Sequence, residues 1–261
     1  MFSRFRQRSY ELEDIDTGNY TAEEYEASIV ELQRVNQWLG DARALRRSLL
    51  ADISHAQLSN FSVLDAGAGS GELMRVAAEW ARENGRRATF VGVELNERSA
   101  EAIIESSAEF SEIKSVRGDA LQLPFASGAF DYGICSLFTH HFVDDDVVRV
   151  LRELSRVARR RIFVIDLFRH PLAYFLYTTL GRLILHSRLL RHDGALSILR
   201  SFKPSELVAL AERAGLQDIT VKRRFPFRLV LSAKAKDVNA GALTRTHETH
   251  YSEERSIRLA S

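Results

Sequence analysis

The chain is organised around one stretch, Phe61–Met74, in which a short apolar segment breaks into a glycine-rich turn and then resumes as a helix-forming segment. Gly67, Gly69 and Gly71 remove every second Cβ from the turn, so backbone N–H groups can approach a ligand above the start of the helix. A strand, a glycine-rich turn and a helix in this order form a ligand-binding unit of parallel α/β sheets. The stretch therefore predicts a ligand site at the turn.

The spacing of the glycines argues against a dinucleotide as the ligand. The dinucleotide fingerprint is G-x-G-x-x-G and places a pyrophosphate at the start of the helix, whereas this chain has G-x-G-x-G. Glu72 follows at once, where its carboxylate would repel a diphosphate. Asp65 ends the strand and suits a ligand that carries an ammonium group, which S-adenosylmethionine has, together with no phosphate.

The segment Asp65–Gly71, D-A-G-A-G-S-G, resembles the first motif of the class I S-adenosylmethionine-dependent methyltransferases. Three further segments in the expected order extend the resemblance over roughly residues 61–167. It implies an α/β fold with a doubly wound, mostly parallel, seven-stranded, Rossmann-like sheet and a helical cap. It also implies S-adenosylmethionine as the cofactor.

Two of the further segments concern the nucleoside part of the cofactor. The apolar stretch from Ala88 ends in Glu94, near the spacing at which an acid accepts hydrogen bonds from ribose hydroxyls, although an acid there can also cap a helix. Gly118–Phe125, G-D-A-L-Q-L-P-F, resembles the family segment whose aspartate and following N–H contact adenine. The resemblance implies a cofactor site that comprises Asp65, Gly67, Gly69, Gly71, Glu94, Leu95, Asp119, Ala120 and Ser136.

The last segment, Phe130–Phe142, reads as a fourth strand that runs into a loop with two adjacent histidines. Ligands of doubly wound sheets lie at the carboxyl ends of the strands, with strands 1 and 4 at the switch point, so His140 and His141 should lie beside the sulfonium. They resemble the histidine pair of many small-molecule methyltransferases. Either histidine is a candidate general base, and the alternative is that the pair only packs the site. Asp166 can reach the acceptor or simply cap.

A metal site is not expected. Asp144–Asp146 is an acidic triplet, but three successive residues at the start of a helix point in different directions, so these acids should stabilise the positive end of that helix.

Outside this core we expect three further parts. Residues 1–55 should form an N-terminal arm, either mobile or in contact with the cap, and a helical cap with one helix from Thr21 and another from Asp41, capped by Asp41, to Ile53. The methyltransferase domain should cover 56–236 and end in a hairpin that turns at Pro226. Residues 237–261 should be a flexible tail.

Within that domain, an insertion at about 168–201 is expected to wall the acceptor pocket, by the same resemblance. It should turn at Arg191–Gly194 and contribute Tyr174, Phe175 and Tyr177 to the pocket.

The composition limits the class of protein, its partners and its cellular compartment. With 261 residues, 45% of them hydrophobic and 27% charged, the chain should be globular, and its net charge of +1 gives no general attraction to nucleic acid or anionic membrane. The single Cys135 excludes an internal disulfide and favours a reducing, cytoplasmic setting. The apolar run Pro171–Leu185 is short and contains Arg182, so no stable membrane insertion is expected.

We therefore expect methyl transfer to a small, lipophilic or aromatic acceptor, such as O- or C-methylation of a polyketide, a quinone or a related metabolite. A protein methyltransferase and a non-catalytic S-adenosylmethionine-binding subunit remain alternatives, and a homodimer is compatible with the sequence. A nucleic-acid amino-methyltransferase would carry an Asn/Asp-Pro-Pro-Tyr/Phe motif, where this chain has Cys135–Phe138.

Overall fold

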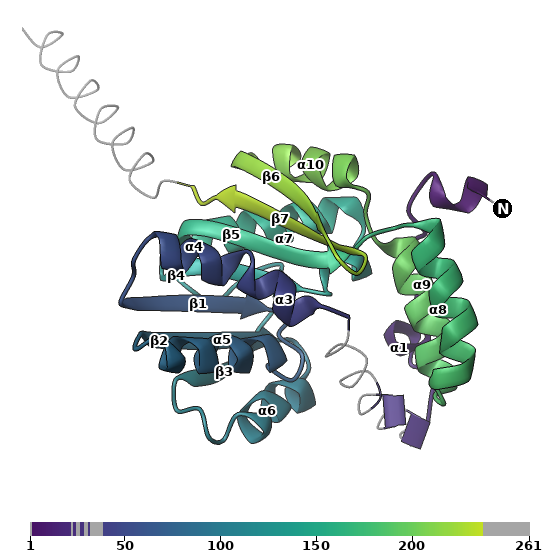
Figure 1. Cartoon of the computed structure of the whole chain (residues 1–261), viewed down its shortest axis with the longest axis horizontal. Coiled ribbons are helices and arrows are strands. Elements are labelled where there is room, and N and C mark those ends of the chain that lie inside the picture. Colours follow the sequence, from purple (N-terminus) through teal and green to yellow (C-terminus); the bar gives the residue numbers. More distant parts are fainter. Residues whose placement is uncertain (1, 22, 25–26, 29–30, 32–38, 237–261) are drawn as a thin grey trace, which may run out of the picture.

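The computed structural model describes residues 2–21, 23–24, 27–28, 31 and 39–236. A central sheet carries helices on both faces, and a pair of helices stands beside the carboxyl ends of its strands (Figure 1). The strands of this sheet are β1 (Asn60–Ala66), β2 (Arg87–Glu94), β3 (Ile113–Arg117), β4 (Phe130–Ser136), β5 (Ala158–Leu167), β6 (Gln217–Arg224) and β7 (Arg228–Lys234).

A helix follows each of β1, β2 and β4 in the chain, as expected for crossover connections between parallel strands, whereas β3 leads to β4 without a helix. The described helices are α1 (Asp14–Thr17), α3 (Asp41–Arg46), α4 (Leu49–His55), α5 (Glu72–Glu83), α6 (Glu97–Ser106), α7 (Asp144–Val157), α8 (Pro171–Ile184), α9 (Arg188–Arg200) and α10 (Pro204–Arg213), with short 3-10 turns η1 (Phe2–Phe5) and η2 (Thr139–His141).

The strand order is β3-β2-β1-β4-β5-β7-β6. Strands β1 to β5 pair in parallel, and β7 is antiparallel to both β5 and β6. The direction of winding reverses between β1 and β4, which is where doubly wound sheets bind their ligands. The predicted seven-stranded, mostly parallel sheet is confirmed, and so is the terminal hairpin, which turns at Pro226 between β6 and β7.

The sheet separates two apolar cores because successive side chains of a strand point to opposite faces. Leu64 and Val164 pack against α7 and α10 on one face. Val63 and Ile165, their neighbours in sequence, pack against α3, α4 and α5 on the other. Cys135 is fully buried in the first core, as its apolar setting predicts. Burial on both faces explains why the strands read as continuous apolar runs.

The insertion after β5 forms α8 and α9, and the predicted turn at residues 191–194 is wrong. The two helices are instead separated at Leu185–Ser187. There the Ser187 hydroxyl accepts a hydrogen bond from the Leu190 N–H at 3.2 Å and so caps α9. Gly194 lies inside α9, and a Cβ there would come within 2.0 Å of the Tyr177 hydroxyl. The glycine is therefore needed for close approach of the two helices, and not for a turn.

The predicted helix 41–53 is also wrong, because it is two short helices, α3 and α4, with Ser48 between them. Asp41 does not cap α3 with its side chain. Its carboxylate is buried and accepts hydrogen bonds from Arg228 at 2.5 and 2.9 Å, which joins α3 to β7. Gly40, with φ of 86°, precedes the helix instead.

The first residues of the N-terminal arm pack against α9 of the insertion. Of the two expectations for the arm, this favours contact with the cap over mobility. The Asp193 carboxylate accepts hydrogen bonds from the N–H groups of Asp14 and Ile15, at 2.9 and 3.0 Å, and so holds α1 on α9. Thr21 and Glu24 form the predicted reciprocal capping box. The body of the helix predicted after Thr21 and the tail predicted at 237–261 lie largely or wholly outside the described residues.

Candidate functional site

The glycine-rich turn between β1 and α5 has the bare backbone that the sequence predicts. Gly67 has φ of 70°, and a Cβ there would lie 2.3 Å from the Phe138 ring, so only glycine fits. Gly69 has φ of 58° with nothing within 4 Å of its would-be Cβ. Gly71, with φ of 77°, starts α5. The outer side of the turn is thus open above the start of the helix.

Two acids lie under this turn. Asp65 is the last residue but one of β1, is 2% exposed, and its Oδ1 has no hydrogen-bond partner among the described residues. Burial, with a smaller contribution from the Glu94 charge, raises the pKa of Asp65 to about 8. Glu94 ends β2 and accepts a hydrogen bond from the Gly69 N–H at 2.5 Å. Burial raises the pKa of Glu94 against the opposing effect of the Gly69 and Leu95 N–H groups.

An unpartnered buried carboxyl group is costly, and it fits a ligand that brings a hydrogen-bond donor with positive charge. Asp65 and the open turn therefore suit a ligand with an ammonium group, as predicted.

The remaining residues of the predicted cofactor site lie after neighbouring strands at the same edge of the sheet. Leu95 follows β2 and is 67% exposed. Asp119 is exposed after β3, and its Oδ1 accepts a hydrogen bond from the Leu121 N–H at 2.8 Å. Ala120 is buried, and Ser136 ends β4 half-buried. The fold thus brings all the predicted positions to the carboxyl edge of β1 to β4.

The loop after β4 holds His140 against a buried carboxylate. The His140 Nδ1 lies 2.7 Å from Asp166 Oδ1, and Asp166 is fully buried at the end of β5. Thr139 Oγ1 and the His140 N–H also donate to Asp166 Oδ2, at 2.5 and 3.2 Å. Burial alone would raise the pKa of Asp166, but His140, Thr139 and the Leu167 N–H outweigh it and lower that pKa to about 2.

An ionised carboxylate can only accept, so in the contact with Asp166 the proton lies on Nδ1 of His140, which leaves Nε2 as the acceptor of the ring whenever the imidazole is neutral. This is the arrangement of an oriented general base. The sequence suggests that Asp166 either contacts the acceptor substrate or caps a helix. Its observed contact with His140 is a third role, which the sequence does not indicate.

His141 packs against the ring of His140 and faces the N-terminal arm. The ring centroids of His140 and His141 are 4.3 Å apart, and His141 Nδ1 lies 3.4 Å from Asp16 and 3.8 Å from Glu13. The side-chain atoms of Glu13, His140 and His141 that could ligate a metal ion lie within 4.8 Å of one another. The Arg200 guanidinium is 3.8 Å from Glu13, and this positive charge disfavours a metal ion there.

Two buried arginines hold the histidine loop from outside. Arg8 donates to the carbonyls of His140 and Phe142 at 3.3 and 3.0 Å, and Arg200 donates to those of His140 and His141 at 3.2 and 2.5 Å. Arg8 also donates to the Arg200 carbonyl at 2.7 Å. The sequence does not indicate either residue, because Arg8 lies in a charged arm without periodicity, Arg200 is the last residue of α9, and neither position carries a local signal.

The aromatic residues predicted to line an acceptor pocket have separate surroundings. Tyr177 lies between α8 and α9, where its hydroxyl donates to the Leu190 carbonyl at 2.6 Å. Tyr174 makes an edge contact with Phe5, with ring centroids 5.6 Å apart. Phe175 is 55% exposed. The contacts of Tyr177 are those of helix packing, and a role for Tyr174 and Phe175 in acceptor binding stays a prediction.

Comparison with known proteins identifies the domain. Residues 64–165 match the family described as "Methyltransferase domain". Over 171 residues the chain is 26% identical to demethylmenaquinone methyltransferase of Bacillus licheniformis, a match that covers 60% of this chain and 71% of that protein.

Two solved structures share the fold. The magnesium protoporphyrin IX methyltransferase of Synechocystis with bound SAH superposes with a TM-score of 0.54 at 17% identity, covering 76% of this chain and 84% of that one. A SAM-dependent methyltransferase of Aquifex aeolicus gives a TM-score of 0.54 at 15% identity, covering 78% of this chain and 98% of that one. From its domain match and its fold, the chain is a class I S-adenosylmethionine-dependent methyltransferase, an enzyme whose cofactor is S-adenosylmethionine.

Proposed function

We propose that the enzyme methylates an oxygen or carbon atom of a small, lipophilic or aromatic acceptor, with His140 as the general base. The contact between His140 and the buried, ionised Asp166 is the observation that carries this proposal. The demethylmenaquinone methyltransferase to which the chain is similar acts, by its name, on a quinone precursor, which supports an acceptor of this class.

The cofactor would lie across the carboxyl ends of β1 to β4. When bound, it supplies an activated methyl group on a sulfonium. Asp65 offers its unpartnered carboxyl to the ammonium group, the turn at Gly69 leaves room for the ligand, and Glu94 accepts from the ribose hydroxyls. Asp119 and Ala120 would contact the adenine.

His140 would then take the proton that the acceptor must lose. Its Nδ1 is committed to Asp166, so Nε2 accepts the proton of a phenol, an enol or an acidic carbon. The imidazolium that forms is stabilised by the Asp166 carboxylate. His141 is the alternative base, but it is 28% exposed and its Nδ1 faces carboxylates of the arm.

The proposal is tested with the purified full chain, S-adenosylmethionine and a panel of hydroxylated quinones, phenols and β-dicarbonyl compounds. We expect S-adenosylhomocysteine and a methylated product in equal amounts with at least one class. Transfer of the methyl group to proteins of a cell extract, with none to its small molecules, would point instead to a protein methyltransferase. Binding of the cofactor without turnover on any acceptor would favour a non-catalytic subunit.

Replacing Glu94 by alanine should weaken the binding of both S-adenosylmethionine and S-adenosylhomocysteine by roughly 1 to 3 kcal/mol. The variant loses an acceptor for the ribose and also the Gly69 hydrogen bond that fixes the turn. Titration calorimetry measures the change. Glu97→Ala is the matched control, since Glu97 is exposed and, among the described residues, pairs only with Arg117. Equal affinities in both variants and the wild type would remove Glu94 from the site.

Relative to an Asp65→Asn variant, affinity for the cofactor should rise with pH as Asp65 ionises, because only a carboxylate pairs fully with an ammonium group. The raised pKa of about 8 places this rise between roughly pH 7 and 9. The folded protein binds a proton that the unfolded chain has already lost in this range, so stability without cofactor should fall as pH rises towards 8.

Asp65→Asn should remove both pH dependences. Calorimetry at pH 6.5 and 9 and thermal unfolding at the same two values give the comparison with the wild type. The free cofactor's own amino group loses its charge in the same pH range, so the ratio of wild-type to variant affinity at each pH, and not either curve alone, reports on the pairing with Asp65. Parallel pH curves for the two proteins would show that Asp65 is not in the cofactor site.

A further inference from the structure

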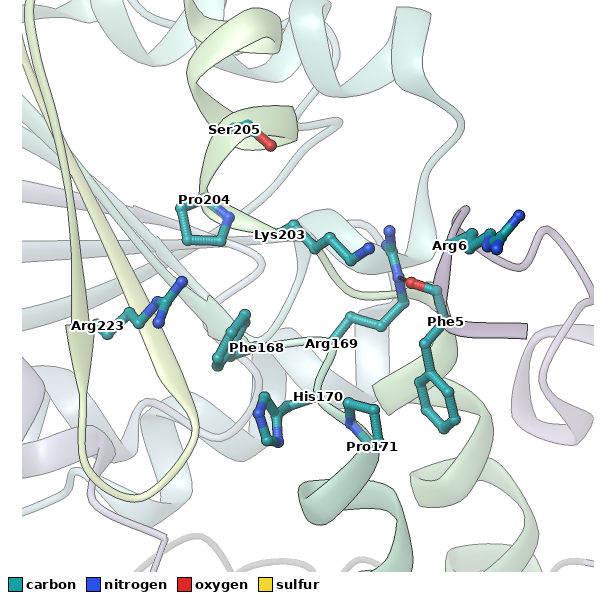
Figure 2. A pocket seen from close by; sticks show the side chains of 10 residues that line it. All are labelled: Phe5, Arg6, Phe168, Arg169, His170, Pro171, Lys203, Pro204, Ser205 and Arg223. Carbon is teal, nitrogen blue, oxygen red and sulfur yellow. Dashed lines mark hydrogen bonds between the residues drawn. The ribbon is translucent and has the colours of Figure 1, made fainter. Parts of the chain in front are cut away.

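A cavity of about 510 Å³ lies beside the carboxyl ends of β5 and β6, between the start of α8 and the start of α10 (Figure 2). This volume is typical of sites for small organic ligands. The segment Phe168–Pro171 after β5, the N-terminal Phe5 and Arg6, residues 203–205 and Arg223 line it. None of these lining residues is acidic, and four of them are arginine or lysine.

The positive charge of the cavity is largely uncompensated. The side chains of Arg6 and Lys203 form no hydrogen bond or ion pair with any described residue, although the Lys203 backbone N–H donates to the Glu206 carboxylate at 2.8 Å. The guanidinium of Arg223 lies 4.9 Å from the Phe168 ring with no carboxylate partner in the described part of the chain. Arg169 is the exception, because it is buried and pairs with Glu206. Since the whole chain has a net charge of only +1, this concentration of cations is local.

The walls also provide apolar surface. Phe168, His170 and Phe227 form a row of rings, with centroid distances of 5.2 and 5.6 Å between neighbours. Figure 2 shows Phe168 between Arg223 and Arg169, with His170 next to it. The start of α10 adds the positive end of a helix dipole near Ser205.

The cavity is separate from the cofactor site. Glu94 ends β2 and Arg223 lies near the end of β6, five strand positions apart in the sheet, which is on the order of 20 Å. The nearer His140 lies behind Arg8, whose guanidinium covers the Phe202 ring at 4.1 Å and donates to the His140 carbonyl. Phe202 in turn pairs with Phe168 of the cavity wall.

We infer that this cavity is a second ligand site, which binds a phosphomonoester with an apolar body. The phosphate would contact Lys203 and Arg223, with Arg6 at the rim, and the apolar body would lie along Phe168 and the adjacent ring. A small soluble phosphate ester and the headgroup of a monoester phospholipid share this chemistry. Leu172 and Phe175 are exposed on α8, which begins at the lining residue Pro171, and would offer apolar surface to the tail of such a lipid.

The test uses the full chain and phenyl phosphate as the soluble probe, with phenol and inorganic phosphate for comparison. We expect saturable binding of phenyl phosphate, weaker binding of inorganic phosphate, no binding of phenol, and loss of affinity as salt is added. Lys203→Gln and Arg223→Gln should each weaken phenyl phosphate binding by about tenfold or more. Arg87→Gln removes the same charge at the opposite end of the sheet, from an exposed side chain, and should have no effect.

Two controls separate this site from the cofactor site. S-adenosylmethionine affinity should be equal in all three variants and the wild type, which also shows that they are folded. Phenyl phosphate should not compete with S-adenosylmethionine. Competition, binding of phenol as strong as that of phenyl phosphate, or equal affinity in all variants would each overturn the proposal.

Vesicles that contain phosphatidic acid distinguish the lipid source. Sedimentation with these vesicles, lost in Lys203→Gln and Arg223→Gln but not in Arg87→Gln, would assign the site to a lipid headgroup if phenyl phosphate does not bind. Binding of phenyl phosphate without sedimentation would assign it to a soluble ester. Absence of both kinds of binding would refute the site.

Discussion

His140→Gln should lower kcat by roughly 100-fold or more while leaving the affinity for S-adenosylmethionine unchanged. Glutamine keeps a hydrogen-bond donor for Asp166 but cannot accept a proton from the acceptor. The wild-type rate should fall as the pH is lowered, because a protonated imidazole is not a base, and the variant should lose this dependence. Steady-state kinetics across pH and calorimetric titration of the cofactor measure both effects.

Two further variants make the result specific. Asp166→Asn should also lower kcat strongly, since the asparagine amide no longer fixes the proton on Nδ1 of His140. His141→Gln should lower kcat much less than His140→Gln does. If His140→Gln lowers stability and cofactor affinity but keeps the pH profile of the wild type, His140 packs the site and the enzyme works by positioning its substrates.

The second large effect concerns stability. Arg228 and Asp41 form a bidentate ion pair whose side chains are only 2% and 5% exposed. Arg228→Met leaves Asp41 buried without its partner, so the free energy of unfolding should fall by about 3 to 5 kcal/mol. Urea denaturation measures this loss.

A matched pair of comparisons isolates the cause. The double variant Asp41→Leu/Arg228→Met removes both charges and should recover most of the stability, because the cost comes from the charge left alone. Arg117→Met breaks an ion pair of which both side chains are more than 60% exposed, at 64% and 69%, and should cost at most about 1 kcal/mol. Equal losses for Arg228→Met and Arg117→Met would contradict the expected role of burial.

The sequence predicts the sheet and the cofactor edge well because their signals are local. The hairpin of β6 and β7 turns at Pro226 as predicted, and the turn after β1 is open at Gly69, as the glycine spacing predicts. A parallel strand buried on both faces has to be apolar along its length, and a turn that admits a ligand has to lack side chains. Such requirements leave a mark in a few consecutive residues.

The errors arise where a residue serves a distant contact. Glycine at 194 is typical of a turn, yet this glycine lies inside α9. Its lack of a side chain leaves room for the Tyr177 hydroxyl of the neighbouring helix. Asp41 has the position of a helix cap, yet its carboxylate turns to Arg228. The cation cavity likewise joins residues from the arm, from the segments after β5 and before α10, and from β6, and no local pattern connects them.

The side chains that hold the histidine loop come from widely separated parts of the chain. The predicted cofactor residues lie between Asp65 and Ser136, in or directly after strands β1 to β4. The contacts of His140 come from much farther away: Arg8 and Arg200, which are 192 residues apart, donate to its carbonyl, and Asp166 of β5 binds its ring. A chain that ended after β4 would therefore contain every predicted cofactor residue and still lack Asp166 and Arg200, two of the three side chains that hold the proposed base in place.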